Sequence, residues 1–374
     1  MSKKSLIDRV QDTICTRDLA NSETPVLLMV SGGSDSTALA YIADELRKRG
    51  RIGQIAIMHL NHMLRGEHAD KDALFVERLA ECLGVPLYTY SIDIAARVAQ
   101  SGENLEALAR RERYAAAQDA LEKLCLRAGL PITQGRIFTA HTRNDRVENF
   151  YMRSIVGTGP GGFRSMLYAN GSIARPLLDT ERDELRDYVK LRAQDAKEDE
   201  RVRIVKDEAG ALWREDATNA HTDQFRAYVR HTIIPKALAR NPRLLETLCR
   251  SMNLIADEDD MLERQVAQLL VVLRKPLAGA RDYTSGCVIE PAFGQVDFPL
   301  QRRMLMHVLQ DMLGADARVE TRSIEVVLAA FEHGQPKSGY TANIQGNLAV
   351  SSNKRGVRIE PMAAYRARRK PNKK

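Results

Sequence analysis

Short apolar runs alternate with amphipathic stretches through the first half of the chain, and this alternation limits its fold more than any other feature. The apolar runs have the length and composition of strands and lie at 26–30, 52–60, 87–92, 136–140 and 173–177. Between them, apolar residues recur at helical spacing over 37–49, 69–83, 104–128 and 145–156. Strands and helices that alternate in this way form a parallel sheet with helices on both faces. The sequence therefore predicts an α/β domain.

The pattern changes after Pro242. Apolar residues recur at helical spacing over 244–273, which predicts one long helix or two shorter ones. The remainder reads as two helices followed by two short strand-like pieces, at 300–313, 324–333, 340–344 and 348–350. We therefore expect an α/β domain over residues 1–240 and a mainly helical domain over residues 241–374.

The composition is that of a folded protein. Hydrophobic residues make up 44% of the chain and charged residues 28%. No apolar run exceeds six residues, which is too short to cross a bilayer, and the first residues lack the apolar region of a signal peptide. The five cysteines stand far apart, in neither a disulfide pattern nor a zinc-binding pattern. We expect a cytoplasmic protein with reduced thiols, no disulfide partner and no membrane contact.

Charge is distributed unevenly along the chain. Residues 354–374 carry nine Lys or Arg and one Glu, so they account for the net charge of +7 and leave the rest close to neutral. This basic tail is either a phosphate-binding element or a solvated terminus, and the sequence leaves both interpretations open. A second charged segment, 190–210, is typical of a surface insertion or a flexible hairpin.

The strongest chemical signal is the turn between the first strand and the first helix, which reads Ser31-Gly-Gly-Ser-Asp-Ser36. Glycines permit backbone geometry that side chains forbid, and amides at the start of a helix point toward an anion, with serine hydroxyls as further donors. The chain has no Gly-Lys-Ser/Thr, so this is not a Walker A loop. Asp35 would repel a phosphate unless a divalent cation lay between them, which indicates a magnesium ligand.

This turn resembles the loop of the ATP pyrophosphatases, which reads Ser-Gly-Gly-x-Asp-Ser. The resemblance implies an adenine nucleotide α-hydrolase-like fold and an enzyme that adenylates an oxygen of its substrate, often a tRNA base. It also implies that ATP pyrophosphate binds at six consecutive residues: Ser31, Gly32, Gly33, Ser34, Asp35 and Ser36.

Further segments narrow the resemblance. They follow the loop at 59–67, 106–114, 140–148, 175–178 and 213–219, with Arg226 and Arg230 beyond them. In this order they are similar to the tRNA(Ile)-lysidine synthases. That family implies a ligase that uses ATP and magnesium to join L-lysine to carbon 2 of the wobble cytidine of tRNA(Ile) with a CAU anticodon. The reaction passes through an adenylated intermediate and releases AMP and pyrophosphate.

The resemblance also assigns roles to residues and domains. His141, Asp145 and Glu148 would serve the active centre together with Asp35. Residues 1–240 would form the catalytic domain, and residues 241–374 would recognise tRNA. Contacts with the substrate and tRNA are expected at six basic side chains: His62, Arg65, Arg110, Arg113, Arg226 and Arg230.

The expected fold supports the same centre independently. Ligands of an open α/β sheet bind at the carboxyl ends of strands, where the strand order reverses. If the first and fourth strands flank that point, the loop at 31–36 meets residues 141–148 there. Asp145 and Glu148 share one helical face, and with Asp35 they could bind magnesium and accept protons from an amine. The alternative is that they are acids favoured by the dipole at a helix start.

Other interpretations remain open. Glu106, Arg110 and Arg113 share one helical face, where they form either an exposed ion pair or a phosphate-binding group. A tRNA base thiolase would use the same loop, but the paired cysteines typical of those enzymes are missing. A non-catalytic RNA-binding protein that responds to ATP is the other rival.

Overall fold

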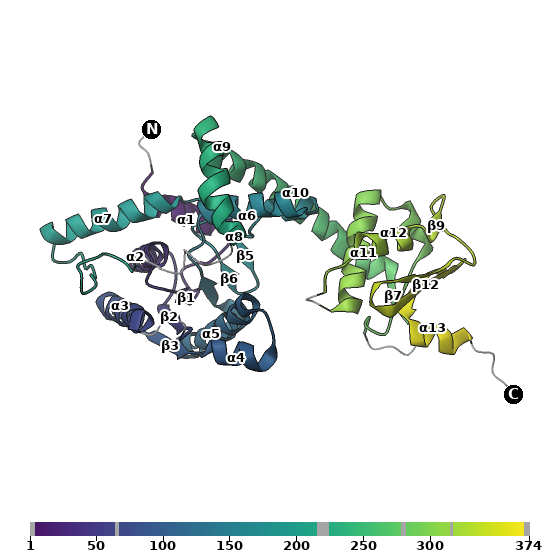
Figure 1. The fold of residues 1–374 in the computed structure, drawn as a ribbon, viewed down its shortest axis with the longest axis horizontal. Helices are drawn as coiled ribbons and strands as arrows, with labels where there is room; N and C mark the ends of the chain where they lie inside the picture. The colour runs from purple at the N-terminus through teal and green to yellow at the C-terminus, as the bar shows by residue number, and fades with distance from the viewer. Residues whose placement is uncertain (1–3, 64–66, 215–223, 278–281, 315–316, 370–374) are drawn as a thin grey trace. The chain divides into compact units, whose positions relative to one another are not determined.

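The computed structural model describes residues 4–63, 67–214, 224–277, 282–314 and 317–369 (Figure 1). The chain divides into two compact units, Met1–Ile255 and Ala256–Lys374. The division falls within α10 (Leu244–Leu273), which is one continuous helix where the sequence allowed one or two. In the described ranges, no helix is both long enough and apolar enough to cross a membrane.

A six-stranded sheet forms the centre of the first unit. Its strand order is β3-β2-β1-β4-β6-β5, and all neighbours pair in parallel except β5 and β6. The strands are β1 (Val26–Met29), β2 (Ile55–Asn61), β3 (Leu87–Ser91), β4 (Arg136–Phe138), β5 (Ala169–Asn170) and β6 (Ile173–Ala174). The predicted parallel sheet is confirmed, and each of the five predicted strands overlaps an observed one.

Helices cover both faces of this sheet, and β1 shows why. Leu28 points into one hydrophobic core and Leu27 into another, and both side chains are fully buried. Alternate strand residues point to opposite faces, so an uninterrupted apolar run fits a strand that is covered on both sides. The first core is built with α1 (Leu6–Thr16), α2 (Ser34–Lys48), α3 (Glu67–Leu83) and α7 (Arg182–Glu198), and the second with α5 (Leu105–Ala128). The sequence did not predict α1 or the short α4 (Ile94–Ser101).

The strand order reverses at β1. The chain runs from β1 to β2 and β3 on one side, then returns to β4 on the other side of β1. The carboxyl ends of β1 and β4 are therefore adjacent, with Leu28 beside Phe138 in the register. α2 begins just after β1, and α6 (Arg143–Val156) begins just after β4. The first and fourth strands therefore flank the point of reversal, as we expected for a binding crevice at this edge of the sheet.

The first half of the segment 190–210 is helical, whereas the sequence predicted a surface insertion or a flexible hairpin. Its residues up to Glu198 complete α7, whose Leu185 and Val189 are buried against the core. Val205 is also buried, and its amide donates to the Tyr41 hydroxyl at 3.0 Å. Only the tight turn at 207–211 has the form of a hairpin. The charges misled the prediction because they lie on the solvated side of a helix with an apolar inner side.

A wide helical turn interrupts the last helix before α10. α8 (Gln224–Tyr228), the π-helical turn η4 (Val229–Ile233) and α9 (Ile234–Arg240) follow one another, and the backbone is helical at both junctions. Pro235 has no N–H to donate and its ring crowds the preceding turn, which accounts for the wider turn before it. Val229 and Ile234 are buried in a core with Val147 of α6.

The second unit combines helices with a sheet. The predicted helices are present as α11 (Phe298–Leu313) and α12 (Thr321–Leu328). The predicted strand pieces belong to an antiparallel sheet of order β11-β12-β13-β8-β7, so the unit contains more sheet than the sequence indicated. These strands are β7 (Arg274–Pro276), β8 (Cys287–Ile289), β11 (Thr341–Ile344), β12 (Leu348–Asn353) and β13 (Gly356–Pro361), and a separate hairpin joins β9 (Phe331–Glu332) to β10 (Gln335–Pro336).

Part of the basic tail is held against this sheet. Residues of α13 (Met362–Arg369) follow β13 directly. Arg368 donates to the buried carboxylate of Glu360 at 2.6 Å, and Arg369 donates to the Tyr365 hydroxyl at 2.6 Å. Residues 370–374 lie outside the described residues. Of the described tail, Arg368 is therefore a structural residue.

Candidate active site

The loop between β1 and α2 has the geometry of an anion cradle. Gly32 has φ +90°, a conformation that side chains rarely adopt, and Gly33 caps the start of α2. The Thr37 hydroxyl donates to the Gly32 carbonyl at 3.2 Å and fixes the turn. The first amides of a helix have no partner within it, so those at the start of α2 are available to an anion.

Serine hydroxyls hold this loop in shape. Ser36 Oγ donates to the Gly33 carbonyl at 3.1 Å and accepts from the Ser31 amide at 3.2 Å. Ser34 Oγ donates to Asp35 Oδ1 at 3.0 Å. The hydroxyls that were predicted to add anion donors are thus engaged within the loop, and the backbone amides are the donors that face outward.

Arg182, the first residue of α7, links the loop to α6. Its Nε donates to Asp35 Oδ2 at 3.0 Å, and its Nη2 donates to Asp145 Oδ1 at 3.0 Å. About a fifth of each of the Arg182 and Asp35 side chains is exposed, and 11% of the Asp145 side chain. One guanidinium therefore joins the two acids from the predicted loop and the predicted helix.

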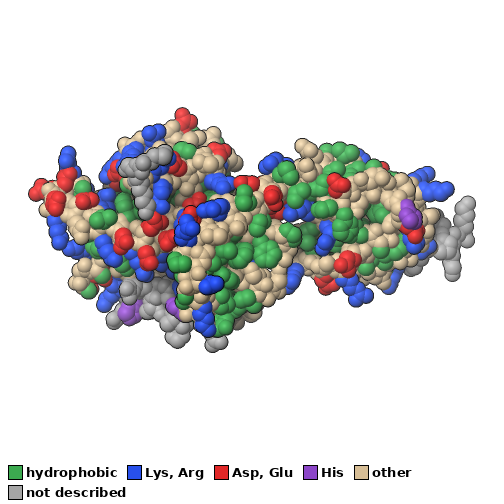
Figure 2. All heavy atoms as spheres, turned by 90° about the horizontal axis from the view of Figure 1, so that it is seen from above, with side chains coloured by type: hydrophobic (Ala, Val, Ile, Leu, Met, Phe, Trp, Pro, Cys, Tyr) green, Lys and Arg blue, Asp and Glu red, His purple; other side chains and the backbone are tan. Residues whose placement is uncertain are grey.

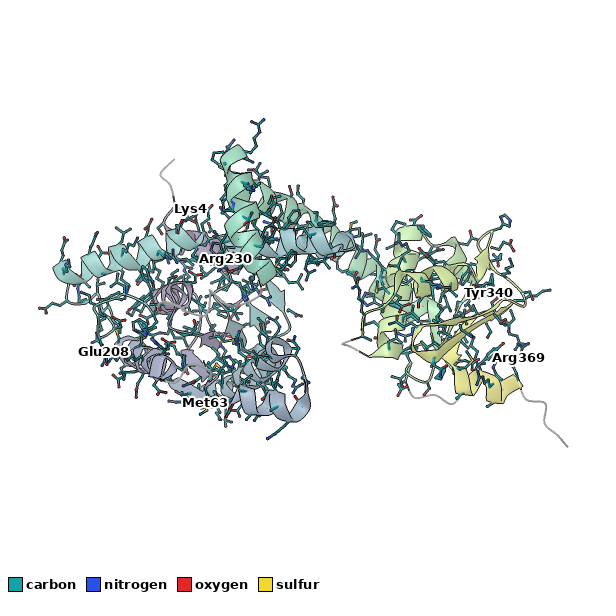
Figure 3. All side chains as sticks on the ribbon, in the orientation of Figure 1. Lys4, Met63, Glu208, Arg230, Tyr340 and Arg369 are labelled. Atoms are coloured by element: carbon teal, nitrogen blue, oxygen red, sulfur yellow. The ribbon has the colours of Figure 1, made fainter. Side chains whose placement is uncertain are left out.

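A second group of ion pairs lies one turn further along α6. Both oxygens of Glu148 accept from arginines: Oε1 from Arg230 Nε at 2.7 Å and Oε2 from Arg226 Nε at 3.0 Å. Only 2% of the Glu148 side chain is exposed. Arg230 is labelled in Figure 3 and lies in the first unit. Together with Arg182, three guanidinium groups therefore face three carboxylates, and the charges of this cluster balance. Its members are Arg182, Arg226, Arg230, Asp35, Asp145 and Glu148.

The two acids that share Arg182 differ in their pKa. Burial raises the pKa of Asp35, and the opposing effect of Arg182 does not overcome it. Burial acts in the same direction on Asp145, but Arg182 and the hydrogen bonds from Thr142 outweigh it and hold the pKa of Asp145 below its usual range. Thr142 caps α6, with its amide donating to Asp145 Oδ2 at 2.8 Å. Asp145 is thus fixed as an anion by its neighbours.

His141 is a neutral group at this end of the sheet. Its Nδ1 lies 2.8 Å from the Thr139 hydroxyl. Burial is the largest cause that lowers the pKa of His141, and with the positive charges of Arg175, Arg226 and Arg110 it brings this pKa to about 4, although Asp145 acts in the opposite direction. The imidazole is therefore uncharged at neutral pH and can accept a proton.

The starts of α6 and α7 are joined by their backbones, which places Arg182. The Arg182 amide donates to Asn144 Oδ1 at 3.0 Å, and the Arg143 amide donates to the Thr180 carbonyl at 2.9 Å. Arg143 also pairs with Glu181 at 2.9 Å. These contacts bring residues nearly 40 positions apart in the chain to one point.

A family model described as the PP-loop domain matches residues 4–203. The chain belongs to this family. The matched region contains the loop, β4, the start of α6 and Arg182, and the match supports the use of ATP.

Curated relatives of this PP-loop chain share one name, tRNA(Ile)-lysidine synthase. The protein from Thermus thermophilus is 36% identical over 249 residues, which cover 66% of this chain and 42% of that protein. The protein from Deinococcus radiodurans is 33% identical over 303 residues (80% and 44%), and that from Dehalococcoides mccartyi is 28% identical over 338 residues (87% and 65%). The chain thus spans less than two thirds of the length of these relatives.

Two solved structures also align with the chain. A U34-tRNA thiolase from Methanococcus maripaludis aligns with 67% of this chain and 78% of its own, with a TM-score of 0.46 and 15% identity. An NH3-dependent NAD synthetase from Campylobacter jejuni aligns with 67% of this chain and 91% of its own, with a TM-score of 0.31 and 17% identity.

The predicted site residues fall into two groups. One group meets at the ends of β1 and β4: Asp35, His141, Asp145, Glu148, Arg226 and Arg230. The other group lies along α5 and the end of β2, where Arg113 is 3.2 Å from His62 Nε2 and Arg110 stacks over Tyr114. Arg65 and residues 216–219 lie outside the described residues, as does the Glu106 side chain, so the choice between an exposed ion pair and a phosphate-binding group stays open.

Asp35 is suited to a magnesium ion but does not form a complete metal site with its protein neighbours. Among the described residues, no three His, Cys, Asp or Glu side chains come together as metal ligands. Magnesium commonly binds one or two carboxylates and completes its shell with phosphate and water oxygens. A partly exposed carboxylate beside a phosphate-binding loop fits that chemistry.

Sequence reasoning missed Arg182 and the role of Arg214. The one available signal for Arg182 was its place in the first turn of a helix, where a cation is unfavourable unless acids compensate it. Arg214 supports the loop from behind: its amide donates to the Gly32 carbonyl at 2.9 Å, and a Cβ on Gly32 would lie 3.4 Å from its side chain.

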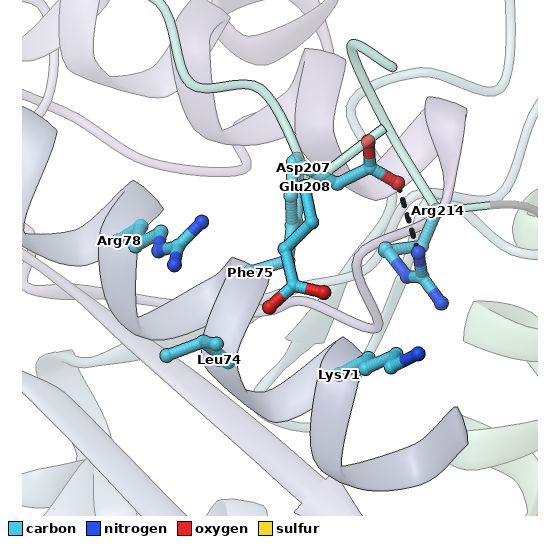
Figure 4. A pocket seen from close by; sticks show the side chains of 7 residues that line it. All are labelled: Lys71, Leu74, Phe75, Arg78, Asp207, Glu208 and Arg214. Atoms are coloured by element: carbon cyan, nitrogen blue, oxygen red, sulfur yellow. Dashed lines mark hydrogen bonds and ion pairs between the residues drawn. The ribbon is translucent and has the colours of Figure 1, made fainter. Parts of the chain in front are cut away.

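A small pocket behind the loop shows how Arg214 is anchored (Figure 4). The Arg214 guanidinium donates to Asp207 Oδ2 at 2.8 Å and to Asp72 Oδ1 at 2.9 Å. These two bonds connect the turn at 207–211 to α3. The pocket is lined by Lys71, Leu74, Phe75, Arg78, Asp207, Glu208 and Arg214. The segment predicted to be an insertion therefore stabilises the loop.

We expect Arg214→Ala to weaken ATP binding while the protein remains folded. The substitution keeps the amide bond to Gly32 but removes the ion pairs to Asp72 and Asp207 that hold residue 214 in place, and a small displacement of phosphate-binding amides lowers affinity by roughly tenfold or more. Arg78→Ala is the matched control, because Arg78 lines the same pocket and is exposed. Calorimetric titration with ATP measures both variants, and equal affinities would contradict the supporting role.

We expect Asp145→Asn to lower the free energy of unfolding at pH 7 by about 2 kcal/mol, because the mostly buried Arg182 guanidinium loses one of the two carboxylates that it joins. The folded pKa of Asp145 lies below its ordinary value of 3.8. Its stabilisation is therefore present above about pH 4 and is lost as the pH falls through the folded pKa. Urea unfolding over a pH series from 7 into acid measures this, and the difference between the wild type and the variant should shrink as the pH falls below about 4.

Asp35→Asn is the contrasting control for that measurement. Because the pKa of Asp35 is raised, its ionised form costs stability as the pH rises above 3.8. The variant should therefore be as stable as the wild type at pH 7, or more stable. Equal destabilisation by the two substitutions would refute the different roles assigned to the two acids.

Proposed function

We propose that this chain joins L-lysine to carbon 2 of the wobble cytidine of tRNA(Ile) with a CAU anticodon, at the expense of ATP. The observation that carries the proposal is the bridge from Asp35 through Arg182 to Asp145. This bridge holds the loop before α2, where phosphate would bind, next to the start of α6 with Asp145. A reaction in which adenylation is followed by ligation needs both regions in one site. The names of the relatives, whose similarity covers 66% to 87% of the chain, support this substrate.

In the first step, the oxygen on carbon 2 of cytidine attacks the α-phosphorus of ATP, and the bond to pyrophosphate breaks. The amides at the start of α2 hold the pyrophosphate. Asp35 holds magnesium, which neutralises phosphate charge when bound. Arg182, Arg226 and Arg230 are fixed by carboxylates, so their positive charge is in place when negative charge develops on the leaving group.

In the second step, the ε-amine of lysine attacks carbon 2, and the bond from carbon 2 to the oxygen of AMP breaks. The amine must lose a proton. His141 is the proposed acceptor because its imidazole is uncharged at pH 7, whereas the oxygens of Asp145 and Glu148 already accept hydrogen bonds from protein donors. Its lowered pKa makes it a weak base, so it would pass the proton on rather than keep it. Asp145 and Glu148 then act by positioning arginines.

The state of four of the five cysteines favours this ligase over a thiolase, and the fifth, Cys15, is exposed on α1. Sulfur transfer needs a reactive thiolate. Burial raises the pKa of four thiols, those of Cys82, Cys125, Cys249 and Cys287, and brings that of Cys249 to about 11. A buried thiol with a raised pKa is a weak nucleophile at neutral pH.

The test is to incubate the protein with ATP, lysine and unmodified tRNA(Ile), and then to weigh the nucleosides. We expect a lysine adduct on cytidine with the wild type and none with folded Asp35→Asn, because the magnesium ligand beside the phosphates is lost. A sulfur-for-oxygen change would point to the thiolase, and unmodified nucleosides would point to the RNA-binding rival. Near-normal AMP production by Asp35→Asn would refute the role of the loop.

A further inference from the structure

The segment 224–243 is strongly basic. It carries five Lys or Arg and one His, with no Asp or Glu. On the face drawn in Figure 2, blue and red side chains are intermingled over much of the surface. The segment forms α8, η4, α9 and the approach to α10. The active site uses two of its cations, Arg226 and Arg230, and leaves Lys236, Arg240 and Arg243.

The helix of this segment has two distinct sides. Arg226, Arg230 and Ile234 follow one another at four-residue spacing on the inner side, where the arginines contact Glu148 and Ile234 is buried. Tyr228 and Arg240 are offset by two residues from this series, which turns them to the opposite side of the helix. Accordingly, the side chain of Tyr228 is 54% exposed and that of Arg240 is exposed.

The three outer cations are not paired with acids in the described ranges. In the part of the chain that the structure describes, the side chains of Lys236, Arg240 and Arg243 form no ion pair or hydrogen bond. By contrast, Arg250 on α10 pairs with Glu246 at 3.1 Å, and Lys190 on α7 pairs with Asp187 at 3.4 Å. Three exposed charges of one sign and an exposed aromatic ring therefore lie within one short stretch of the chain, 228–243.

We infer that Tyr228, Lys236, Arg240 and Arg243 form an RNA-binding face, called the outer face below. The cations hold backbone phosphates, and the Tyr228 ring stacks on an unpaired base. Twelve residues of helix separate Tyr228 from Arg240, a rise of roughly 18 Å, which is long enough to follow several phosphates of one strand. The inference rests on the proposed function for the identity of the RNA.

An RNA strand fits this face better than an acidic protein does. Single-stranded RNA is recognised by stacking on aromatic side chains together with contacts to its phosphates, and Tyr228 and the three cations offer both. The inner side of the same helix reaches Glu148 through Arg226 and Arg230. A base that enters the active site therefore leaves its neighbouring nucleotides within reach of the outer face.

Replacing Lys236, Arg240 and Arg243 together by Gln tests the phosphate contacts in the full chain. Each lost contact reduces the dependence of log affinity on log salt by roughly 0.7 to 0.9, so loss of all three should reduce the slope by roughly two to three. The matched control replaces Lys190, Lys197 and Lys206 by Gln, which are three exposed lysines on α7 and after it. The measurement is affinity for a tRNA(Ile) transcript over a salt series, with circular dichroism to confirm folding.

Tyr228→Ala tests stacking against the conservative Tyr228→Phe. We expect Tyr228→Ala to lose roughly tenfold or more in affinity for an isolated CAU anticodon stem-loop, and Tyr228→Phe to bind like the wild type, because stacking needs the ring and not the hydroxyl. Equal affinities of Tyr228→Ala and the wild type would remove Tyr228 from the face.

The outcomes separate this inference from the proposed function. If the variant with Lys236, Arg240 and Arg243 replaced by Gln has the same salt slope as the wild type, the outer face does not bind RNA. This conclusion holds whether or not the wild type makes lysidine. A slope loss as large in the control triple would also overturn it, because the effect would not be local. Loss of binding to poly-aspartate without loss of RNA binding would assign the face to an acidic protein. If the wild type binds tRNA with the expected slope difference but makes no lysidine, only the proposed function fails.

Discussion

The guanidinium of Arg182 lies between two carboxylates that would otherwise repel each other, and the crevice depends on this placement. Asp35 and Asp145 belong to the first turns of α2 and α6, where helix dipoles favour acids. Arg182 begins α7, where the dipole disfavours a cation, so the two acids offset that cost. One planar side chain thus joins the starts of three helices at the carboxyl ends of β1 and β4, through bonds of 3.0 Å to each acid.

The charges of the cluster balance, but its two bridged acids are not equivalent. Asp145 also accepts from the amide and hydroxyl of Thr142, whereas the only donors to Asp35 among the described residues are Arg182 and the Ser34 hydroxyl. Accordingly, the pKa of Asp145 falls and that of Asp35 rises. A carboxylate that is held less firmly by its own protein is the one that can exchange a protein donor for a metal ion. This difference supports a structural role for Asp145 and a ligand role for Asp35.

The sheet and the loop could be predicted because their signals are local. An apolar run, two glycines and a helical pattern occur within residues 26–49, and the strand order then followed from general rules. The ion pairs could not be predicted in this way, because Arg182 is 147 residues from Asp35 and Arg226 is 78 residues from Glu148. Asp207, which anchors Arg214, was hidden in the segment 190–210 that was predicted to be an insertion. The second unit's sheet was underestimated because two of its strands, β7 and β8, have three residues each.

The π-helical turn η4 explains how one helix can serve both the chemistry and the surface. In a regular α-helix, residues four apart drift by roughly 40° per step, so a series from Tyr228 to Arg240 would wind around the axis by about 120°. A π turn has more residues per revolution and reduces this drift. Arg226 and Arg230 can then both contact Glu148 while Ile234, further along the helix, remains buried. Tyr228 and Arg240 stay on the opposite side of the helix. Because Pro235 disfavours a regular turn before it, the sequence itself fixes where this widening occurs.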